Sequence, residues 1–299
     1  MWSGILPAVT TKFTTEDTLD HEEMERCFGL LIEAGCDGLI VCGSLGEGPM
    51  LSHDEKLAVL KTARSVAGKK SVLLTVNEAA TRDAASLARR AAEAGADGLM
   101  VVPSLVYQTD DRYVVSVKPL TPVAEAGGLP VMIYSNRRAY RVDVTVPIME
   151  ELAKDDLFVA VKESCGDIRR TTEIVNAFGD RFAILTGVDN LAFEALAAGA
   201  VGWVAGLVTA FPRETVAIGR LTKAGRWEEA REIYRWFRPL LDLDVSTYLV
   251  QNIKLAEVIE IGSNDRVRLP RQPLAGEQRA RVERIIWEAI ANRPELPLA

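Results

Sequence analysis

The sequence predicts an α/β fold: a (β/α)8 barrel followed by a C-terminal helical appendix. Three observations lead there. Eight apolar segments of strand length recur along the 299 residues, helical patterns separate most of them, and a short motif repeats 60 positions apart, about two βα units. The segments are apolar throughout, as parallel strands buried on both faces are. Eight such units favour a closed barrel, and a doubly wound open sheet is the alternative.

The predicted strands and helices alternate along residues 1–224. The strands are residues 5–10, 38–42, 71–76, 98–102, 131–134, 158–162, 182–186 and 202–207, and clear helical patterns between them occupy residues 22–34, 54–67, 82–94 and 171–178. Residues 211–224 supply the last helix of the barrel. Beyond them, residues 226–240, 247–261 and 276–292 are predicted to be helices without intervening strands. We therefore expect a barrel at residues 1–224 and a C-terminal helical extension at residues 225–299.

The repeated motif marks the passage from a helix to a strand. It runs EAGCDGL at residues 33–39 and EAGADGL at residues 93–99, with a weaker copy, AAGAVGW, at residues 197–203. In each copy a helical pattern ends at a glycine, the residue expected just past a helix C-terminus, and an apolar run follows at once.

Composition excludes several classes of protein. With 48% hydrophobic residues the chain can form a large core, and a net charge of −7 argues against binding nucleic acid or anionic membranes. The N-terminal segment MWSGILPAVTTKF lacks the pattern of a signal peptide, and the longest uncharged stretch, residues 195–211, falls just short of a membrane span. We expect a cytoplasmic protein that binds neither nucleic acid nor a membrane.

The cysteines and histidines do not form a metal or disulfide pattern. Four cysteines lie in apolar surroundings without CxxC spacing, so buried, reduced thiols are expected at residues 27, 36, 42 and 165. His21 and His53 lie beside acidic residues where helices should begin, and both are expected to be exposed. His21 opens a HEEME segment in which Glu25 stands where HExxH needs a second histidine. We expect no metal, no cofactor and no histidine-dependent catalysis.

Candidate chemistry lies where strands end, because barrel sites are built at the C-terminal ends of strands. Lys162 closes the sixth predicted strand, and burial there would lower its pKa toward a free amine able to form a Schiff base with a carbonyl. The alternative is a lysine whose ammonium reaches solvent. Tyr134 closes the neighbouring fifth strand, close enough to shuttle protons for that amine, unless it is an ordinary core tyrosine.

The loop after the second strand is a third candidate. Its sequence, GSLGEG at residues 43–48, could hold an anion with backbone amides. The glycine spacing is GxxGxG rather than GxGxxG, and no P-loop lysine follows, so a plain turn remains an alternative. The segments after strands seven and eight carry no cation beside Gly187 and Gly206, which disfavours a phosphate-ester enzyme.

These motifs together resemble one family. GSLGE, the YSN segment after strand five, VKES after strand six and GVD after strand seven resemble the dihydrodipicolinate synthase/N-acetylneuraminate lyase family of class I lyases, in order and over essentially the whole chain. The resemblance implies a TIM barrel, commonly a homotetramer, that acts on pyruvate or another 2-oxo acid without a cofactor. A non-enzymatic barrel would be expected to lack Lys162 or Tyr134.

The resemblance also implies roles for individual residues. Lys162 would form the Schiff base, Tyr134 would relay protons, and Tyr107 would match a tyrosine that a neighbouring subunit supplies. Ser44 and Leu45, through the loop that they form, would hold the substrate carboxylate. The remaining residues expected to line the substrate pocket are Gly43, Asn136, Gly187 and Val204, the last presenting its carbonyl.

Departures from the family pattern bear on the substrate. Leu45 stands where synthases and many lyases have a second hydroxyl residue, and Ala139 stands where the synthase has an arginine for the carboxylate of its aldehyde substrate. Arg137 and Arg138 are out of register. GSLGE, Asn136 and the AYRVD segment at residues 139–143 look most like pyrroline-4-hydroxy-2-carboxylate deaminases. The expected reaction converts this cyclic imine to a 2-oxo acid and ammonia, and a pyruvate-dependent aldolase and a sugar-acid dehydratase are the alternatives. The departures at Leu45 and Ala139 disfavour a true dihydrodipicolinate synthase.

Overall fold

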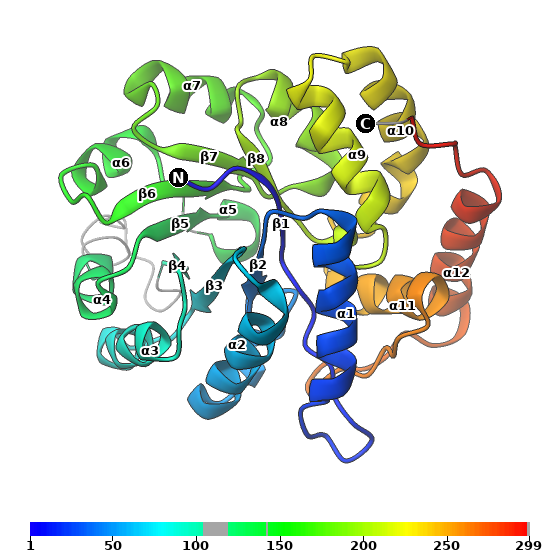
Figure 1. Cartoon of the computed structure of the whole chain (residues 1–299), viewed down its shortest axis with the longest axis horizontal. Coiled ribbons are helices and arrows are strands. Elements are labelled where there is room, and N and C mark those ends of the chain that lie inside the picture. The colour runs from blue at the N-terminus through cyan, green and yellow to red at the C-terminus, as the bar shows by residue number, and fades with distance from the viewer. Residues whose placement is uncertain (104–118, 142, 298–299) are drawn as a thin grey trace.

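Eight parallel strands form one sheet that curls into a nearly closed barrel surrounded by helices (Figure 1). The computed structural model describes residues 1–103, 119–141 and 143–297. The strands are β1 Gly4–Pro7, β2 Gly38–Val41, β3 Ser71–Val76, β4 Gly98–Val101, β5 Val131–Ser135, β6 Phe158–Glu163, β7 Ala183–Thr186 and β8 Gly202–Ala205. Hydrogen bonds link them in the order β1-β8-β7-β6-β5-β4-β3-β2, and a parallel bridge between Ala8 and Ile40 joins β1 to β2. The predicted (β/α)8 barrel is therefore confirmed, and the open doubly wound sheet is excluded.

Most of the helices lie outside the strands, as Figure 1 shows. Through the barrel they are α1 His21–Ala34, η1 Gly48–Met50, α2 His53–Ala67, α3 Thr81–Glu93, α4 Leu120–Gly127, α5 Arg137–Tyr140, α6 Val146–Leu152, α7 Arg169–Phe178, η3 Asp189–Leu191, α8 Ala192–Ala197, η4 Leu207–Thr209 and α9 Pro212–Lys223. The ranges predicted for strands one and eight extend beyond the C-terminal ends of β1 and β8. Val9 lies beyond the end of β1, and its amide donates one hydrogen bond to the Ile40 carbonyl. Leu207 is the first residue of the 3-10 helix η4 and not the last residue of a strand.

The barrel interior is a separate apolar cluster. Its buried side chains come from alternate positions of the strands, as expected when inward and outward residues alternate. They are Leu6, Ala8, Ile40, Leu73, Met100, Val102, Met132, Tyr134, Ala160, Ala183, Leu185 and Val204. The outward residues pack with the helices in a larger core. Tyr134 therefore reaches the interior at the C-terminal end of the barrel.

The repeated motif has the conformation that its sequence predicts. The three glycines, Gly35, Gly95 and Gly199, have φ angles of 98°, 89° and 108°. These are left-handed values that a residue with a Cβ adopts only with strain. They follow α1, α3 and α8, and β2, β4 and β8 begin three residues later. Each copy thus turns the chain from the outer helix layer back into the barrel.

Three further helices follow the barrel helices, α10 Trp227–Leu241, α11 Leu249–Ile261 and α12 Gly276–Ala291. They lie together on one side of the molecule, with α10 against α9 and α12 touching both α10 and α11 (Figure 1). Helix α11 is buried over most of its length and also contacts η4 at the end of β8. The C-terminal helices therefore reach the rim of the barrel where the strands end.

The predictions for cysteine and histidine are largely confirmed. All four cysteines are buried and free, and burial raises the pKa of the Cys42 thiol to about 12. Both histidines begin helices, but His53 is half-buried beside Glu78 rather than exposed. Among the helices that the structure describes, none is both long and apolar enough to cross a membrane.

Candidate active site

Lys162 and Tyr134 meet at the C-terminal end of the barrel. They are register partners on the adjacent strands β6 and β5, so both side chains point into the interior. The Lys162 Nζ lies 4.4 Å from the centroid of the Tyr134 ring, and the two residues are 7% and 5% exposed. Adjacent parallel strands place residues in register on the same face, which explains why a strand-end lysine and a strand-end tyrosine come together.

The surroundings of Lys162 favour its neutral amine. Burial lowers the pKa of Lys162, because an ammonium loses hydration in the barrel mouth. The charge of Asp244 opposes this effect most strongly, followed by Tyr140 and Asp189. The interpretation of a solvent-reaching lysine is therefore wrong for this structure. A buried amine with a lowered pKa can attack a carbonyl or imine carbon.

Tyr134 is held by Asn136 and stays protonated. The Asn136 Nδ2 donates to the Tyr134 hydroxyl at 2.9 Å, while the Asn136 Oδ1 accepts from the amide of Ala139 as the N-cap of α5. Burial raises the pKa of Tyr134 despite this hydrogen bond. A neutral phenol beside an amine can give a proton to an oxygen leaving the attacked carbon and take one back later.

A second tyrosine, Tyr140, links the two sides of the site. Its hydroxyl hydrogen-bonds with that of Ser44 in the loop after β2, and its ring meets the Tyr134 ring edge-on at 5.5 Å and 81°. Burial, reinforced by Tyr134, raises the pKa of Tyr140 to about 12. Sequence reasoning did not select Tyr140 as a site residue. The available signal was a tyrosine in the short segment that follows Tyr134.

The loop after β2 leaves backbone donors free. The Gly48 amide bonds to the Gly43 carbonyl at 3.0 Å and the Glu47 amide to the Ser44 carbonyl at 3.3 Å, which closes a tight turn. Within the described ranges, the amides of Ser44 and Leu45 donate to no protein acceptor. The Leu45 side chain is buried in the outer core, so the group it can offer a ligand is its amide. Two free amides and the Ser44 hydroxyl suit a carboxylate.

The other predicted pocket residues lie as follows. Gly187 borders Lys162, and Val204 has its side chain in the barrel interior. A Cβ on Gly43 would lie 3.5 Å from Thr75 Oγ1 and 3.6 Å from Met100 Cε. Tyr107 falls outside the described residues, so its predicted role stays a prediction. Among the described residues there is no group of His, Cys, Asp and Glu suited to a metal ion.

Gly187 gives the Lys162 side chain its space. A Cβ at residue 187 would overlap the Ser164 hydroxyl and lie 2.8 Å from the Lys162 Cγ. We therefore expect Gly187→Ala to displace Lys162 and to slow the attack of its amine on a carbonyl on the order of 100-fold. The measurement is the rate at which borohydride traps pyruvate on the protein. Gly29→Ala is the matched control, because a Cβ there meets nothing within 4 Å. Equal trapping rates for the two variants would contradict the prediction.

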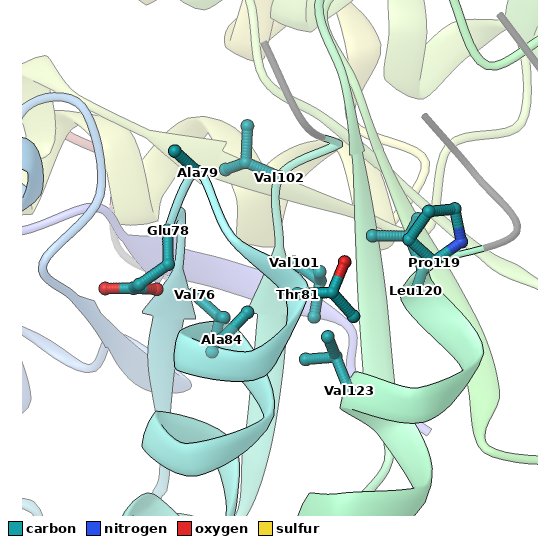
Figure 2. Close-up of a pocket in the computed structure, with 10 residues that line it drawn as sticks. All are labelled: Val76, Glu78, Ala79, Thr81, Ala84, Val101, Val102, Pro119, Leu120 and Val123. Carbon is teal, nitrogen blue, oxygen red and sulfur yellow. The ribbon is translucent and has the colours of Figure 1, made fainter. Parts of the chain in front are cut away.

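A small pocket, shown in Figure 2, is lined by a different set of residues. It opens beyond the ends of β3 and β4 and between α3 and α4. Its lining is Val76, Glu78, Ala79, Thr81, Ala84, Val101, Val102, Pro119, Leu120 and Val123. The carboxylate in this lining belongs to Glu78, which forms an ion pair with Lys56. The described residues that line this pocket include no lysine and no cysteine, so the candidate nucleophile Lys162 lies elsewhere.

Comparison with known proteins identifies a matching family, similar enzymes and a similar solved structure. The model of the dihydrodipicolinate synthetase family matches residues 1–289. The 4-hydroxy-tetrahydrodipicolinate synthase of Acidiphilium cryptum is 32% identical over 94% of this chain and 96% of that protein. The enzyme of the same name from Natronomonas pharaonis is 30% identical over 95% and 97%. The crystal structure of dihydrodipicolinate synthase from Aquifex aeolicus superposes with a TM-score of 0.90 at 28% identity, covering 99% of each chain.

Proposed function

Because the chain belongs to the dihydrodipicolinate synthetase family, we propose that it is a Schiff-base lyase in which Lys162 is the nucleophile. The observation that carries the proposal is the buried Lys162 amine, 4.4 Å from the centroid of the Tyr134 ring at the barrel mouth. Its substrate is a 2-oxo acid or the cyclic imine of one. The amine attacks the carbonyl or imine carbon, and the adjacent C–H becomes acidic once the iminium has formed.

The neighbouring groups supply binding and proton transfer in this proposal. The Ser44 hydroxyl and the amides of Ser44 and Leu45 hold the substrate carboxylate, and the hydrogen bond to Tyr140 orients Ser44. Tyr134, fixed by Asn136, gives a proton to the oxygen or nitrogen that leaves the attacked carbon. No metal or cofactor takes part. We further propose a cytoplasmic homo-oligomer, a tetramer by family resemblance, which sedimentation analysis would test.

The specific reaction that we propose is deamination of 1-pyrroline-4-hydroxy-2-carboxylate. Lys162 adds to the ring imine carbon, and the ring C–N bond at that carbon breaks as the nitrogen takes a proton, which leaves an iminium on Lys162. The carbon between the iminium and the hydroxyl-bearing carbon then loses a proton, and the 4-hydroxyl leaves as water. The new double bond shifts to give an imine at the carbon that still bears the nitrogen, and two water molecules hydrolyse this imine and the Lys162 imine, releasing ammonia and a 2-oxo acid. Support comes from Ala139, which presents a methyl group and a capped amide where a condensing enzyme would need a cation for a second carboxylate. A reaction with a single substrate needs no such cation.

One observation favours a second function, condensation of pyruvate with an aldehyde that bears a carboxylate. Arg138 is exposed and its Nη1 lies 3.4 Å from the position of a Cβ on Gly166, in the loop after β6. It forms no ion pair with any residue of the described ranges. A free guanidinium near the site could bind a second carboxylate. Sugar-acid dehydration is a third reaction open to the same Lys162 and Tyr134.

The test is to supply each substrate to the purified protein. We expect ammonia from the hydroxypyrroline carboxylate, measured in a coupled dehydrogenase assay, and no consumption of pyruvate with the aldehyde. Tyr134→Phe is expected to lower the rate by about 10²- to 10⁴-fold, as loss of a general acid does. Condensation without ammonia release would overturn the deaminase assignment and leave the Schiff-base lyase. Failure of every 2-oxo acid in a panel to be trapped by borohydride would overturn both.

A further inference from the structure

Asp244 belongs to the segment between α10 and α11, far along the chain from the strands, yet it lies at the barrel mouth. Its Cγ is 2.9 Å from the position that a Cβ on Gly206 would occupy. Gly206 directly follows β8, so only a residue without a side chain lets the carboxylate approach there. Asp244 is half-buried, and no residue of the described ranges donates a hydrogen bond to its carboxylate.

The neighbouring acid, Asp189, is used differently. It is fully buried, and its oxygens accept from Trp203 Nε1 at 2.8 Å and from the Gly206 and Leu207 amides at 3.1 Å and 2.8 Å. Four donor contacts leave it little capacity for a ligand and fix the turn after β8. Asp189 therefore shapes the surface on which Asp244 lies. Asp244 is the carboxylate with free acceptors.

Electrostatics ties Asp244 to Lys162. Of the charged groups near Lys162, Asp244 raises the pKa of that lysine most, ahead of Tyr140 and Asp189. In return Lys162 lowers the pKa of Asp244, which burial and Asp189 raise well above its usual range. The titratable groups that face this pair are Tyr134 on β5, Tyr140 on α5 and Asp189 on η3. A buried cation is costly without a negative partner, and Asp244 can supply one.

We infer that Asp244 is a positioning carboxylate of the active site, the counter-ion of the iminium that forms on Lys162. The inference rests on the proposed function. When the carbinolamine loses its oxygen, the Tyr134 proton goes to that oxygen, water departs, and the nitrogen keeps a positive charge. Burial favours the neutral acid of Asp244, but a positive charge on Lys162 favours its carboxylate, which in turn stabilises the iminium and the protonated amine before it. A C-terminal helical segment thereby completes a site otherwise built by the strands and their loops.

The test compares Asp244→Asn with two other variants, using pyruvate as the probe and borohydride to trap the adduct. Loss of the charge is expected to move the acidic limb of trapping about one pH unit lower, because the pKa of Lys162 falls. At neutral pH the trapped adduct is expected to fall about tenfold, because the iminium loses its counter-ion. Asp244→Glu keeps the charge and should keep the wild-type limb.

Asp242→Asn is the matched control. Asp242 lies two residues earlier, is exposed, and pairs with Arg238, so its loss should not change trapping. If Asp244→Asn kept the acidic limb and the adduct yield of the wild type, the inference would be overturned. It would also be overturned if Asp244→Glu, which keeps the charge, showed the lowered limb and yield expected of Asp244→Asn. Thermal unfolding shows which variants are folded. If Asp244→Asn does not fold, the inference is judged on Asp244→Glu, which must keep the acidic limb of the wild type. Failure of the wild type to trap pyruvate or any other 2-oxo acid would instead overturn the proposed Schiff-base function.

Discussion

Lys162→Met is expected to abolish turnover while leaving the protein folded. Methionine has nearly the volume of lysine but no amine, so no Schiff base can form, and the rate should fall on the order of 10⁴-fold or more. Stability should not fall, because the buried amine is replaced by an apolar group of similar shape. The measurements are turnover, mass spectrometry after borohydride reduction, and the thermal unfolding midpoint.

The control for this change is Lys61→Met. Lys61 is exposed on α2, so its loss removes one positive charge without touching the barrel mouth. It should retain full turnover and a trapped adduct. A reduced adduct on the Lys162→Met protein, or turnover within tenfold of the wild type, would contradict the assignment of Lys162 as the nucleophile.

The barrel and the pair of residues at its centre could be predicted from the sequence because both depend on local periodicity. Eight apolar runs and a repeated glycine fixed the order of helices and strands, and Lys162 and Tyr134 follow from the ends of two neighbouring runs. Helices α4, α5 and α6 were not identified individually. They have four to eight residues, too few for a clear apolar period.

Tyr140 and Asp244 could not be placed from the sequence for a different reason. Each reaches the site from a connecting segment whose course depends on tertiary packing, not on a period of two or 3.6. Asp244 in particular enters from beyond the eighth strand, where the sequence indicates only helices. The side chain of Leu45 illustrates the same limit. Its position in the GSLGE loop suggested contact with a carboxylate, but its side chain is in the outer core.

The loop that carries Ser44 is tied to α11 by buried charges. Glu47 is fully buried with a left-handed φ of 56°, and its carboxylate accepts from Lys254 Nζ at 2.6 Å and from the Arg268 amide at 3.0 Å. A second pair lies beside it, with Lys12 Nζ 2.6 Å from Glu257. Because Glu47 lies two residues after Leu45 in the same turn, this ion pair fixes the amides proposed to hold the substrate carboxylate.

Breaking the Glu47–Lys254 pair is expected to have the largest effect on stability. Among the described residues, Lys254→Met leaves the buried Glu47 carboxylate with the neutral Arg268 amide as a hydrogen-bond donor and with Arg271, at 3.8 Å, as its one positive partner. Removing one member of a buried pair costs about 3–5 kcal/mol of unfolding free energy. Glu47→Gln should cost less, because burial already lowers the pKa of Lys254 to about 8 and its amine can become neutral.

A double-mutant cycle with chemical denaturation measures the coupling. We expect the Lys254→Met/Glu47→Gln protein to lose less stability than the sum of the single changes, because the two buried charges disappear together. Strictly additive losses would contradict a coupled pair. The single variants should also raise the pyruvate concentration needed for half-maximal trapping, since the Ser44 turn loses its anchor.

The pH dependence of the unfolding free energy of the same proteins tests the direction of the Lys254 pKa shift independently. The pKa of Lys254 is about 8 in the folded protein and near 10.5 when exposed, so the unfolded chain binds more protons between these values. Stability then rises with pH across that interval, because the cost of keeping the ammonium buried disappears as it deprotonates. The difference in unfolding free energy between the wild type and Lys254→Met should therefore grow from pH 8 to pH 10.5. A difference that stays constant would mean that Lys254 is not the buried titrating group, and a difference that shrinks would reverse the sign of its shift.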